Sequence, residues 1–467
     1  MRPAKYGFSE PMPGLTACQK KRSNSPLSGS TSKAWEELFR VLNLQQKLQE
    51  SQLAVVTADV IKTVTRREPR LMTKFDTRES RPRILEGVTL LPLSNGEYAL
   101  LQGDGYCDVP NANLVKVWSK EKWRSDLVTL PWETGPNSES QALDMASASG
   151  ILDDFFEDSN TRLTIRGRLR CPRFEFRFRC DSREIALVAN GVQVEVDSGF
   201  EGEKVHLIEA KLGNRANFHQ RQLYFPLRMW STLVEKKPAV AVFLTWSNRC
   251  VSLRGFAFDP LDLYQSQVPV TSVDYLLDEP ESLPNLAELL DGTREHTGEI
   301  GTPFPQADDM RRVIDCVDAI GSGLVSRSSL ATHYGFAGRQ ADYYANAAVY
   351  LSLLEKSERS FKLSALGHRF ATATLNVRHE LLLRQMVSRP VFRQVAQKLV
   401  LTGRMPTLDD VTQLVANRTR LTRVTSMRRA KTVIAWLRWA EHILDSNSND
   451  PLAPRAELSG QYRLFRL

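Results

Sequence analysis

Apolar residues recur at helical spacing where the first folded segment of the chain begins, after residue 32. Residues 33–48 carry them three and four positions apart, which predicts an amphipathic helix, and the run over 51–64 predicts a second helical stretch. Two short apolar runs then flank Asn95 and Gly96, and an Asn-Gly pair in this setting predicts a tight β-hairpin. The pattern indicates an N-terminal α+β domain over 33–132, preceded by a polar tail over 1–32 that we expect to be disordered.

The middle of the chain changes to strand-like periodicity. Residues 133–150 are polar and small, which predicts a linker. Beyond it, alternation with period two predicts strands, and residues 217–236 are helical in period. The predicted strands are FEFRFR, GVQVEVDSGF, KVHLIEAKL and AVAVFLTW. Strands followed by a helix and a further strand predict an α/β or α+β domain, which we place at 150–260.

The C-terminal third is predicted to be almost entirely helical. Residues 259–308 are Pro-rich and acidic, which predicts a linker with one short helix. Helices are then expected at 326–333 and 338–354, joined by a turn at Gly335 and followed by a β-wing in the SERSFKLS segment. This unit, over 308–375, resembles a winged helix-turn-helix, and a basic helical region follows it over 376–467.

Composition narrows the class of protein. A hydrophobic share of 42% and a charged share of 25% are ordinary for a folded chain. Lys and Arg outnumber Asp and Glu by 62 to 54, and the net charge of +8 is compatible with a polyanionic partner. The six cysteines are scattered without zinc-ligand spacing, and no apolar run reaches the roughly 18 residues of a membrane span. We expect a cytoplasmic protein with no membrane partner.

Two of the predicted strands bring charged residues together. In GVQVEVDSGF the valines alternate with polar residues, so Glu195 and Asp197 share one face. In KVHLIEAKL, Glu209 and Lys211 likewise share a face. A turn at Gly199–Gly202 would fold the two strands into a hairpin and place Asp197 near Glu209. Mg²⁺ prefers carboxylate oxygens and water, so this trio predicts a magnesium site.

The spacing of these residues resembles a known motif. Asp197, eleven intervening residues and then Glu209-Ala210-Lys211 resemble the PD-(D/E)xK nuclease superfamily, in the form found in type II restriction endonucleases. Val196 stands where the motif has Pro, a departure that the superfamily often shows. The likeness covers residues 160–250 best and includes the RQLYFP segment over 221–226, with weaker likeness over 67–76 and in the C-terminal third.

The resemblance implies a restriction-endonuclease-like core fold, a cofactor and a role for each site residue. Asp197 and Glu209 would bind Mg²⁺, and Lys211 would orient or help deprotonate the attacking water. Gln220 and Gln222 follow on the next helix, where such nucleases often carry a polar residue that supports the Lys or the water. The substrate would be double-stranded DNA cut at a short sequence by a homodimer. A cognate DNA methyltransferase would be encoded nearby without being a physical partner.

Several alternatives stay open from the sequence. An E-x-K tripeptide arises by chance in many chains of this size, and amphipathic strands normally expose charges. Glu195 lies one pleat from Asp197, so it is either a metal ligand or a solvent-facing acid. A winged-helix DNA-binding regulator without catalysis, or a repair-type nuclease with the same core, would share most of these features.

Two helical segments are candidates for DNA contact. Polar residues on the N-terminal half of the second winged-helix helix could reach base edges in the major groove: Arg339, Gln340, Tyr343 and Asn346. The densest positive run of the chain, which includes Arg428 and Arg429, could contact phosphates. The alternatives are a protein-binding winged helix and a solvated helix face.

Overall fold

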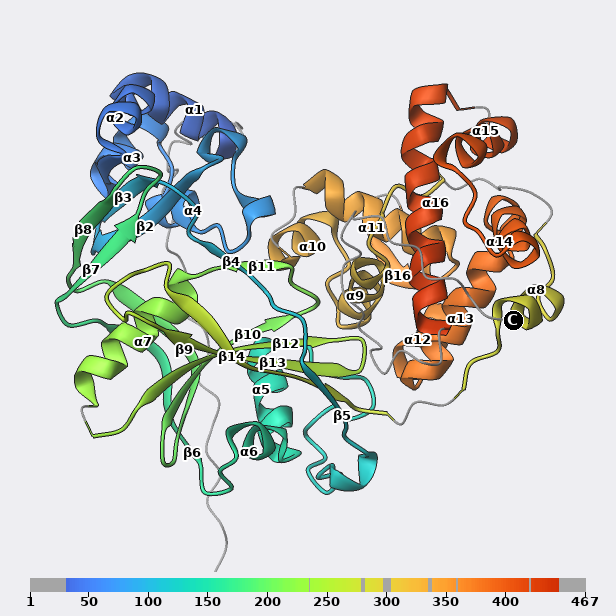
Figure 1. Cartoon of the computed structure of the whole chain (residues 1–467), viewed down its shortest axis with the longest axis horizontal. Coiled ribbons are helices and arrows are strands. Elements are labelled where there is room, and N and C mark those ends of the chain that lie inside the picture. Colours follow the sequence, from blue (N-terminus) through green and yellow to red (C-terminus); the bar gives the residue numbers. More distant parts are fainter. Residues whose placement is uncertain are drawn as a thin grey trace, which may run out of the picture.

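A seven-stranded mixed sheet lies at the centre of the chain, with a largely helical region beside it (Figure 1). The computed structural model describes residues 31–234, 236–278, 282–296, 304–334, 338–357, 360–419 and 421–444. The strand order is β5-β14-β13-β12-β10-β9-β6, in which β10–β12 and β14–β5 pair in parallel and the other neighbours are antiparallel. The strands are β5 (Leu114–Val117), β6 (Arg162–Arg170), β9 (Gln193–Glu201), β10 (Val205–Leu212), β12 (Ala239–Ser247), β13 (Cys250–Phe258) and β14 (Gln267–Leu276).

Helices cover both faces of the sheet at β10. Ile208, Ala210 and Leu212 pack in one apolar cluster with side chains of α5 (Glu139–Ala148) and α6 (Ile151–Phe156). Val205 and Leu207 pack in another cluster with side chains of α7 (Arg221–Leu233). A strand that is buried on both faces needs a nearly continuous apolar run, which is what KVHLIEAKL supplies apart from its charged residues.

The predicted linker over 133–150 is wrong, because it contains helix α5. Ser138 caps the helix, since its side chain accepts a hydrogen bond from the Gln141 amide. Ala142, Leu143, Met145 and Ala146 of this helix are buried against the sheet. Small residues let a helix lie close to a strand, so the composition that suggests a loop instead serves close packing.

The predicted linker over 259–308 is wrong in part as well. Residues Gln267–Leu276 form β14, which pairs with β13 and with β5. The expected short helix is present as α8 (Leu286–Asp291). The sheet therefore uses residues on both sides of the 150–260 range, including β5 at Leu114–Val117. Pro269 interrupts the hydrophobic pattern of β14, which hides the strand at the sequence level.

The N-terminal part is a small α+β unit, but its sheet ends at Gln102 rather than near 132, because Leu114–Val117 belongs to the central sheet. The hairpin at Asn95 and Gly96 is confirmed, and its sheet has the order β1-β3-β2. The second helical stretch is wrong in its first half, because Leu53–Thr57 pairs with β3 as a strand. The elements are α1 (Thr31–Leu42), α2 (Leu44–Ser51), β1 (Leu53–Thr57), α3 (Ala58–Thr65), α4 (Pro69–Thr73), η1 (Arg78–Ser80), η2 (Arg83–Leu85), β2 (Val88–Ser94) and β3 (Glu97–Gln102).

Short elements connect this unit to the sheet. Strand β4 pairs with β11, and β7 pairs with β8 in a separate hairpin. Their bounds are β4 (Tyr106–Asp108), η3 (Lys120–Lys122), β7 (Phe174–Arg179), β8 (Glu184–Ala189) and β11 (Asn217–His219). Because β11 comes immediately before α7, the β4–β11 pair joins the N-terminal part to the region that holds the candidate site.

The C-terminal region is helical, as predicted, with one short hairpin. The helix expected over 338–354 ends at Tyr350, because the chain turns at Ser352 (φ 61°) into β15. The elements are α9 (Met310–Gly321), α10 (Arg327–Tyr334), α11 (Gly338–Tyr350), β15 (Leu354–Lys356), β16 (Phe361–Leu363), α12 (Ala365–Thr372), α13 (Leu375–Val387), α14 (Pro390–Thr402), α15 (Leu408–Thr419) and α16 (Arg423–Leu444). Gly335 and residues 1–30 of the predicted tail lie outside the described residues.

The length and polarity of the helices bear on the expectation about membranes. Among the described residues, no helix is both long enough and apolar enough to cross a membrane.

Candidate active site

The candidate site lies where β9 and β10 separate. The two strands pair in register from Glu201 and Val205 as far as Ser198 and Ile208, and their pairing ends there. Asp197 and Glu209 are the next residues on each strand. Instead of donating to a β9 carbonyl, the Ala210 N–H donates to Asp197 Oδ2 over 2.9 Å. We call this point the fork, and Asp197 and Glu209 are the first residues beyond the paired part of each strand.

The predicted turn at Gly199–Gly202 is misplaced. Gly199 lies inside β9 and pairs with Leu207, and the turn falls at 202–204 instead. A Cβ atom at Gly199 would lie 2.7 Å from the Cβ of Ile165, so glycine is needed for the close approach of β6. The later turn sets the register in which Glu201 pairs with Val205 and Ser198 with Ile208, so Asp197 and Glu209 come next on the two strands.

Glu209 and Lys211 form a buried ion pair. Lys211 Nζ lies 2.6 Å from Glu209 Oε1 and donates a second hydrogen bond to the Ala210 carbonyl over 2.9 Å. Gln222, on the first turn of α7, donates its side-chain N–H to the same Glu209 oxygen. The Glu209 and Lys211 side chains are only 9% and 13% exposed. The structure thus gathers Asp197, Glu209, Lys211 and Gln222 in one place.

Glu139 is a further site residue that the sequence reasoning missed. It is the first residue of α5, and its Oε1 lies 3.2 Å from Lys211 Nζ. The Lys211 ammonium therefore lies between the carboxylates of Glu139 and Glu209. The linker predicted over 133–150 hides Glu139, because a linker residue has no fixed place beside a strand. The signal that could have found it is the Ser138 cap followed by an acidic first turn.

Burial sets the electrostatics of the trio. Burial raises the pKa of Glu209 to about 8, against the lowering effect of the Lys211 ammonium. Burial also raises the pKa of Asp197, although Lys211 and the Ala210 N–H oppose it. Burial alone would lower the pKa of Lys211, but Glu209, Glu139 and Asp197 outweigh it and raise this pKa. Burial therefore opposes ionisation of the two carboxylates, and the Lys211 ammonium is the charged neighbour that favours it.

The donor set fits a hard divalent cation held by two carboxylates. Within the described ranges, the second oxygen of Asp197 and that of Glu209 accept no hydrogen bond from protein, so both could be cation ligands. Across those same ranges, no group of three or more His, Cys, Asp or Glu side chains lies close enough to hold a metal ion. Mg²⁺ usually takes one or two protein carboxylates and completes its shell with water and substrate phosphate.

Glu195, whose role the sequence leaves open, lies outside this group. Its carboxylate forms a surface ion pair with Arg168 at 3.1 Å, and its side chain is 52% exposed. Gln220 also points away, because its amide donates to the Tyr264 carbonyl. The structure therefore separates Glu195 and Gln220 from Asp197 and Gln222, their near neighbours in sequence.

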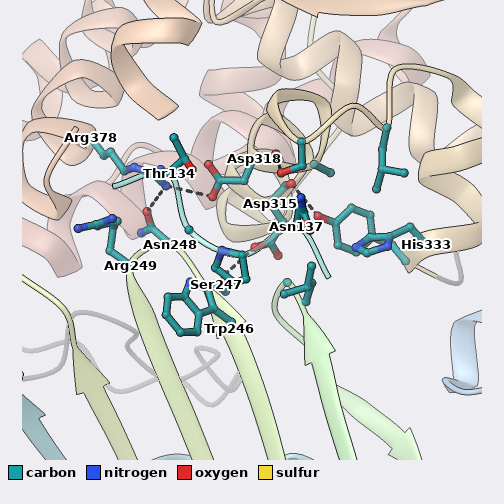
Figure 2. Close-up of a pocket in the computed structure, with 18 residues that line it drawn as sticks. Thr134, Asn137, Trp246, Ser247, Asn248, Arg249, Asp315, Asp318, His333 and Arg378 are labelled. Atoms are coloured by element: carbon teal, nitrogen blue, oxygen red, sulfur yellow. Dashed lines mark hydrogen bonds and ion pairs between the residues drawn. The ribbon is translucent and has the colours of Figure 1, made fainter. Parts of the chain in front are cut away.

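Helix α9 is fastened to the sheet near the end of the strand that carries Glu209 and Lys211, and Figure 2 shows Asp315 of α9 beside Ser247, the last residue of β12. Asp315 is 3% exposed and accepts hydrogen bonds from the Asn214 amide (2.7 Å) and from Ser247 Oγ (2.6 Å). Asn214 lies three residues beyond Lys211. Burial raises the pKa of Asp315 to about 6. A Cβ atom at Gly213 would lie 2.5 Å from the Tyr334 ring, so α10 also packs tightly on this turn.

The predicted DNA-contact residues of α11 differ in exposure. Arg339 is exposed, and its guanidinium carbon lies 5.7 Å from the centroid of the Tyr343 ring. Gln340, Tyr343 and Asn346 are half-buried. Asn346 Oδ1 accepts a hydrogen bond from Lys356 Nζ on β15 over 3.1 Å, which ties it to the hairpin. Arg339 is therefore the member of this set that solvent reaches most freely.

The basic run of α16 lies beside α11. Arg428 is exposed, whereas Arg429 is half-buried near Tyr343. Burial lowers the pKa of Arg429, and Tyr343 opposes that effect. The structure thus brings together two segments that are about 90 residues apart in the sequence and that are both predicted to contact DNA.

Comparison with known families gives three partial matches. Residues 32–100 match a domain of unknown function, DUF6996, residues 101–276 match DUF6997, and residues 312–445 match DUF7226. No curated protein and no solved structure matches the chain. The 101–276 match contains all seven strands of the sheet and every residue of the candidate site from Glu139 to Gln222.

Proposed function

We propose that the protein is a Mg²⁺-dependent endonuclease that hydrolyses phosphodiester bonds of double-stranded DNA at a specific short sequence. The fork of β9 and β10 is the observation that carries this proposal. It places Asp197 on the amide of Ala210, the residue between Glu209 and Lys211, and the side chains of Glu209 and Lys211 are in contact and almost fully buried. A buried ion pair often stabilises a fold no more than apolar residues of similar volume would, so stability alone is a weak reason for this arrangement. A nuclease of the PD-(D/E)xK type requires this arrangement.

Each residue would have a distinct role in hydrolysis. Asp197 and Glu209 would hold Mg²⁺, with Glu139 near enough to Lys211 to steer the ammonium. The bound cation would lower the pKa of a water ligand and stabilise the charge that gathers on the phosphate. Lys211 would orient the attacking water or help to deprotonate it. Gln222 would keep Glu209 in position through the hydrogen bond that it donates.

Sequence recognition would come from a winged-helix-like unit. Its elements follow the order α9, a bridge at Ser326, α10, α11, β15 and β16, and the bridge pairs Ser326 with Ser360. Helix α11 would lie in the major groove with Arg339 and Gln340 facing bases. One active site of this kind would cut one DNA strand. We therefore further propose that the protein acts on a duplex as a homodimer.

Incubation of the full chain with unmethylated plasmid and Mg²⁺ tests the proposal. Discrete fragments of reproducible length are expected, and the Lys211→Ala variant purified in parallel should give none. Cleavage without fixed bands would favour a repair-type nuclease. Specific binding without any cleavage, in the presence of Mg²⁺ or Mn²⁺, would favour the regulator and overturn the proposal.

A further inference from the structure

The segment from residue 62 to residue 83 is strongly basic. It holds eight Lys and Arg against three Asp and Glu, an excess of five in a chain whose net charge is +8. Solubility alone is served by mixed charges, whereas a concentration of one sign attracts a partner of opposite charge. This segment, which spans α3, α4, η1 and η2, is not part of the candidate active site described above.

The basic segment is fixed directly beside the candidate active site. The Arg78 amide donates to Asn217 Oδ1 over 2.8 Å, and the His219 amide donates to the Asp76 carbonyl over 2.8 Å. Asn217 and His219 are the two ends of β11, and Gln222 follows three residues after His219. The part of the basic segment around Asp76 and Arg78 therefore lies beside the strand that leads into α7 and Gln222.

The helical region meets the same place from the other side. Arg312 of α9 lies 3.8 Å from Glu79 of η1, and the Glu79 carboxylate also accepts hydrogen bonds from the Asn217 side chain. In Figure 1 the N-terminal part and α10 stand on either side of the β4–β11 pair. The basic segment and α10, the helix that precedes the proposed reading helix α11, thus lie on either side of this strand pair.

Several cations of the segment are not neutralised by the protein. Arg66, Arg70 and Lys74 are exposed. Among the described residues Arg66 and Arg70 form no ion pair, and Lys74 has only a long contact of 4.0 Å with Asp76. By contrast, Arg78 is held by Asp104 and Asp108. Arg66, Arg70 and Lys74 are therefore available to an external anion, whereas Arg78 is used in ion pairs within the protein.

We propose that Arg66, Arg70 and Lys74, here called the basic strip, bind the phosphate backbone of duplex DNA on the side of the site away from α11. The inference rests on the proposed function for the identity of the polyanion. Phosphate contacts fix the register and orientation of a duplex without reading its sequence. A second contact surface would therefore hold the scissile phosphate over the fork while α11 selects the site.

Salt-dependent binding by the full chain tests the basic strip. The variant Arg66→Gln/Arg70→Gln/Lys74→Gln is compared with a control that also loses three exposed cations, Lys47→Gln/Lys204→Gln/Lys236→Gln. The control positions lie on α2 and just before the first residues of β10 and β12, away from Glu209. Binding to a fluorescent duplex is measured in EDTA at several salt concentrations, and plasmid cleavage by the wild type is measured with Mg²⁺.

The strip variant should bind at least about tenfold more weakly at low salt, and the slope of log affinity against log salt should become shallower by about two to three. The control should stay within about twofold of the wild type. Equal losses in both variants would mean that only net charge matters and would overturn the inference, as would binding by the wild type to an acidic protein but not to duplex DNA. If the wild type cuts plasmid and the strip variant binds duplex as tightly as the wild type does, the basic strip does not bind DNA, and the proposed nuclease function is kept. If the wild type binds duplex but cuts no plasmid, the nuclease function is rejected. In that case the salt slopes of the variants still test whether the basic strip binds DNA.

Discussion

The fork of β9 and β10 and the face formed by α11 and α16 carry charge in opposite ways. At the fork, Glu209 and Lys211 are nearly buried, and each is held by hydrogen bonds to neighbours in the sheet and in α7. On the helical face, Arg339 and Arg428 are exposed, with their charged ends in solvent. One region fixes its charges in advance, and the other leaves them free to meet a ligand.

This difference in burial matches what catalysis and DNA reading would each require. Chemistry depends on groups that are already oriented, because reorganisation during the reaction adds to the barrier. Reading DNA requires side chains that can reach base edges, so exposure is part of the function. Variants in the two regions should therefore separate cleavage from binding.

The largest effect is expected at the fork. Asp197→Ala removes one of two strong ligands, and Lys211→Ala removes the group that positions water, so either change should lower cleavage by about a thousandfold or more. DNA binding should persist, and Asp197→Ala should bind as tightly or more tightly, because it removes a negative charge near the phosphate. Cleavage and gel-shift assays on the same samples measure both.

Glu195→Ala is the matched control for the fork. It removes an acid from the same strand, two residues from Asp197, but from a surface ion pair with Arg168. Its cleavage rate should remain near that of the wild type. A severe loss in this variant, or near-normal cutting by Lys211→Ala, would contradict the assignment of the site.

The next largest effect concerns the connection between the two regions. Asp315→Ala leaves the Asn214 amide and Ser247 Oγ without their buried partner, so we expect a loss of about 1–3 kcal/mol in stability. The cleavage rate should fall by about tenfold or more with binding less affected, because β10 is no longer fastened to α9. Asp315→Asn should restore most of the rate, since an amide can accept from Asn214 and donate to Ser247. Equal rates in all three proteins would show that this connection does not position the strand.

The sequence predicts the fork better than its surroundings. Asp197, Glu209, Lys211 and Gln222 are brought together because strand alternation and a hairpin are local features that residue patterns encode. The local pattern places Gly199 in a turn, whereas its close approach to Ile165 depends on β6, which lies about 35 residues away in sequence. Long-range packing of this kind leaves no local signal.

The two segments wrongly predicted as linkers share one physical cause. Ser, Gly and Pro in or near helix α5 and strand β14 are typical of loops. Tertiary contacts override those weak preferences, since α5 packs on β10 and β14 joins two strands of the sheet. The positions of Glu139 and Asp315 beside β10 depend on the same long-range contacts, and the local sequence offers only the Ser138 cap as a sign of the helix that carries Glu139.

A smaller effect, limited to sequence choice, is expected on the helical face. Arg339→Ala/Gln340→Ala should reduce discrimination against altered sites by about 1–3 kcal/mol for each base that the variant can no longer read, while plasmid cutting continues at more positions. Arg428→Ala should instead weaken binding to all sequences alike and make the salt slope shallower by about one. Competition binding with a library of altered duplexes distinguishes the two. Unchanged selectivity in the first variant would move base reading to another part of the chain.

The smallest expected effect concerns whether water reaches the side chains of strand β10. His206, on β10, is 6% exposed and stacks on Phe156 with ring centroids 3.8 Å apart. Burial lowers the pKa of His206 to about 4, below its ordinary value of 6.5. Between these two pKa values the unfolded chain binds a proton at His206 more tightly than the folded chain does. The free energy of unfolding therefore decreases as the pH falls through this interval. For one such group the loss between about pH 7 and about pH 5 amounts to about 2 kcal/mol.

His206→Phe keeps the ring stack and removes the titrating group, so its free energy of unfolding in urea should fall less than that of the wild type over the same range. The buried His379, whose pKa is also lowered to about 4, remains in both proteins and cancels in the difference. An equal fall in both proteins would mean that water reaches His206 and that this face of β10 is not sealed by α6.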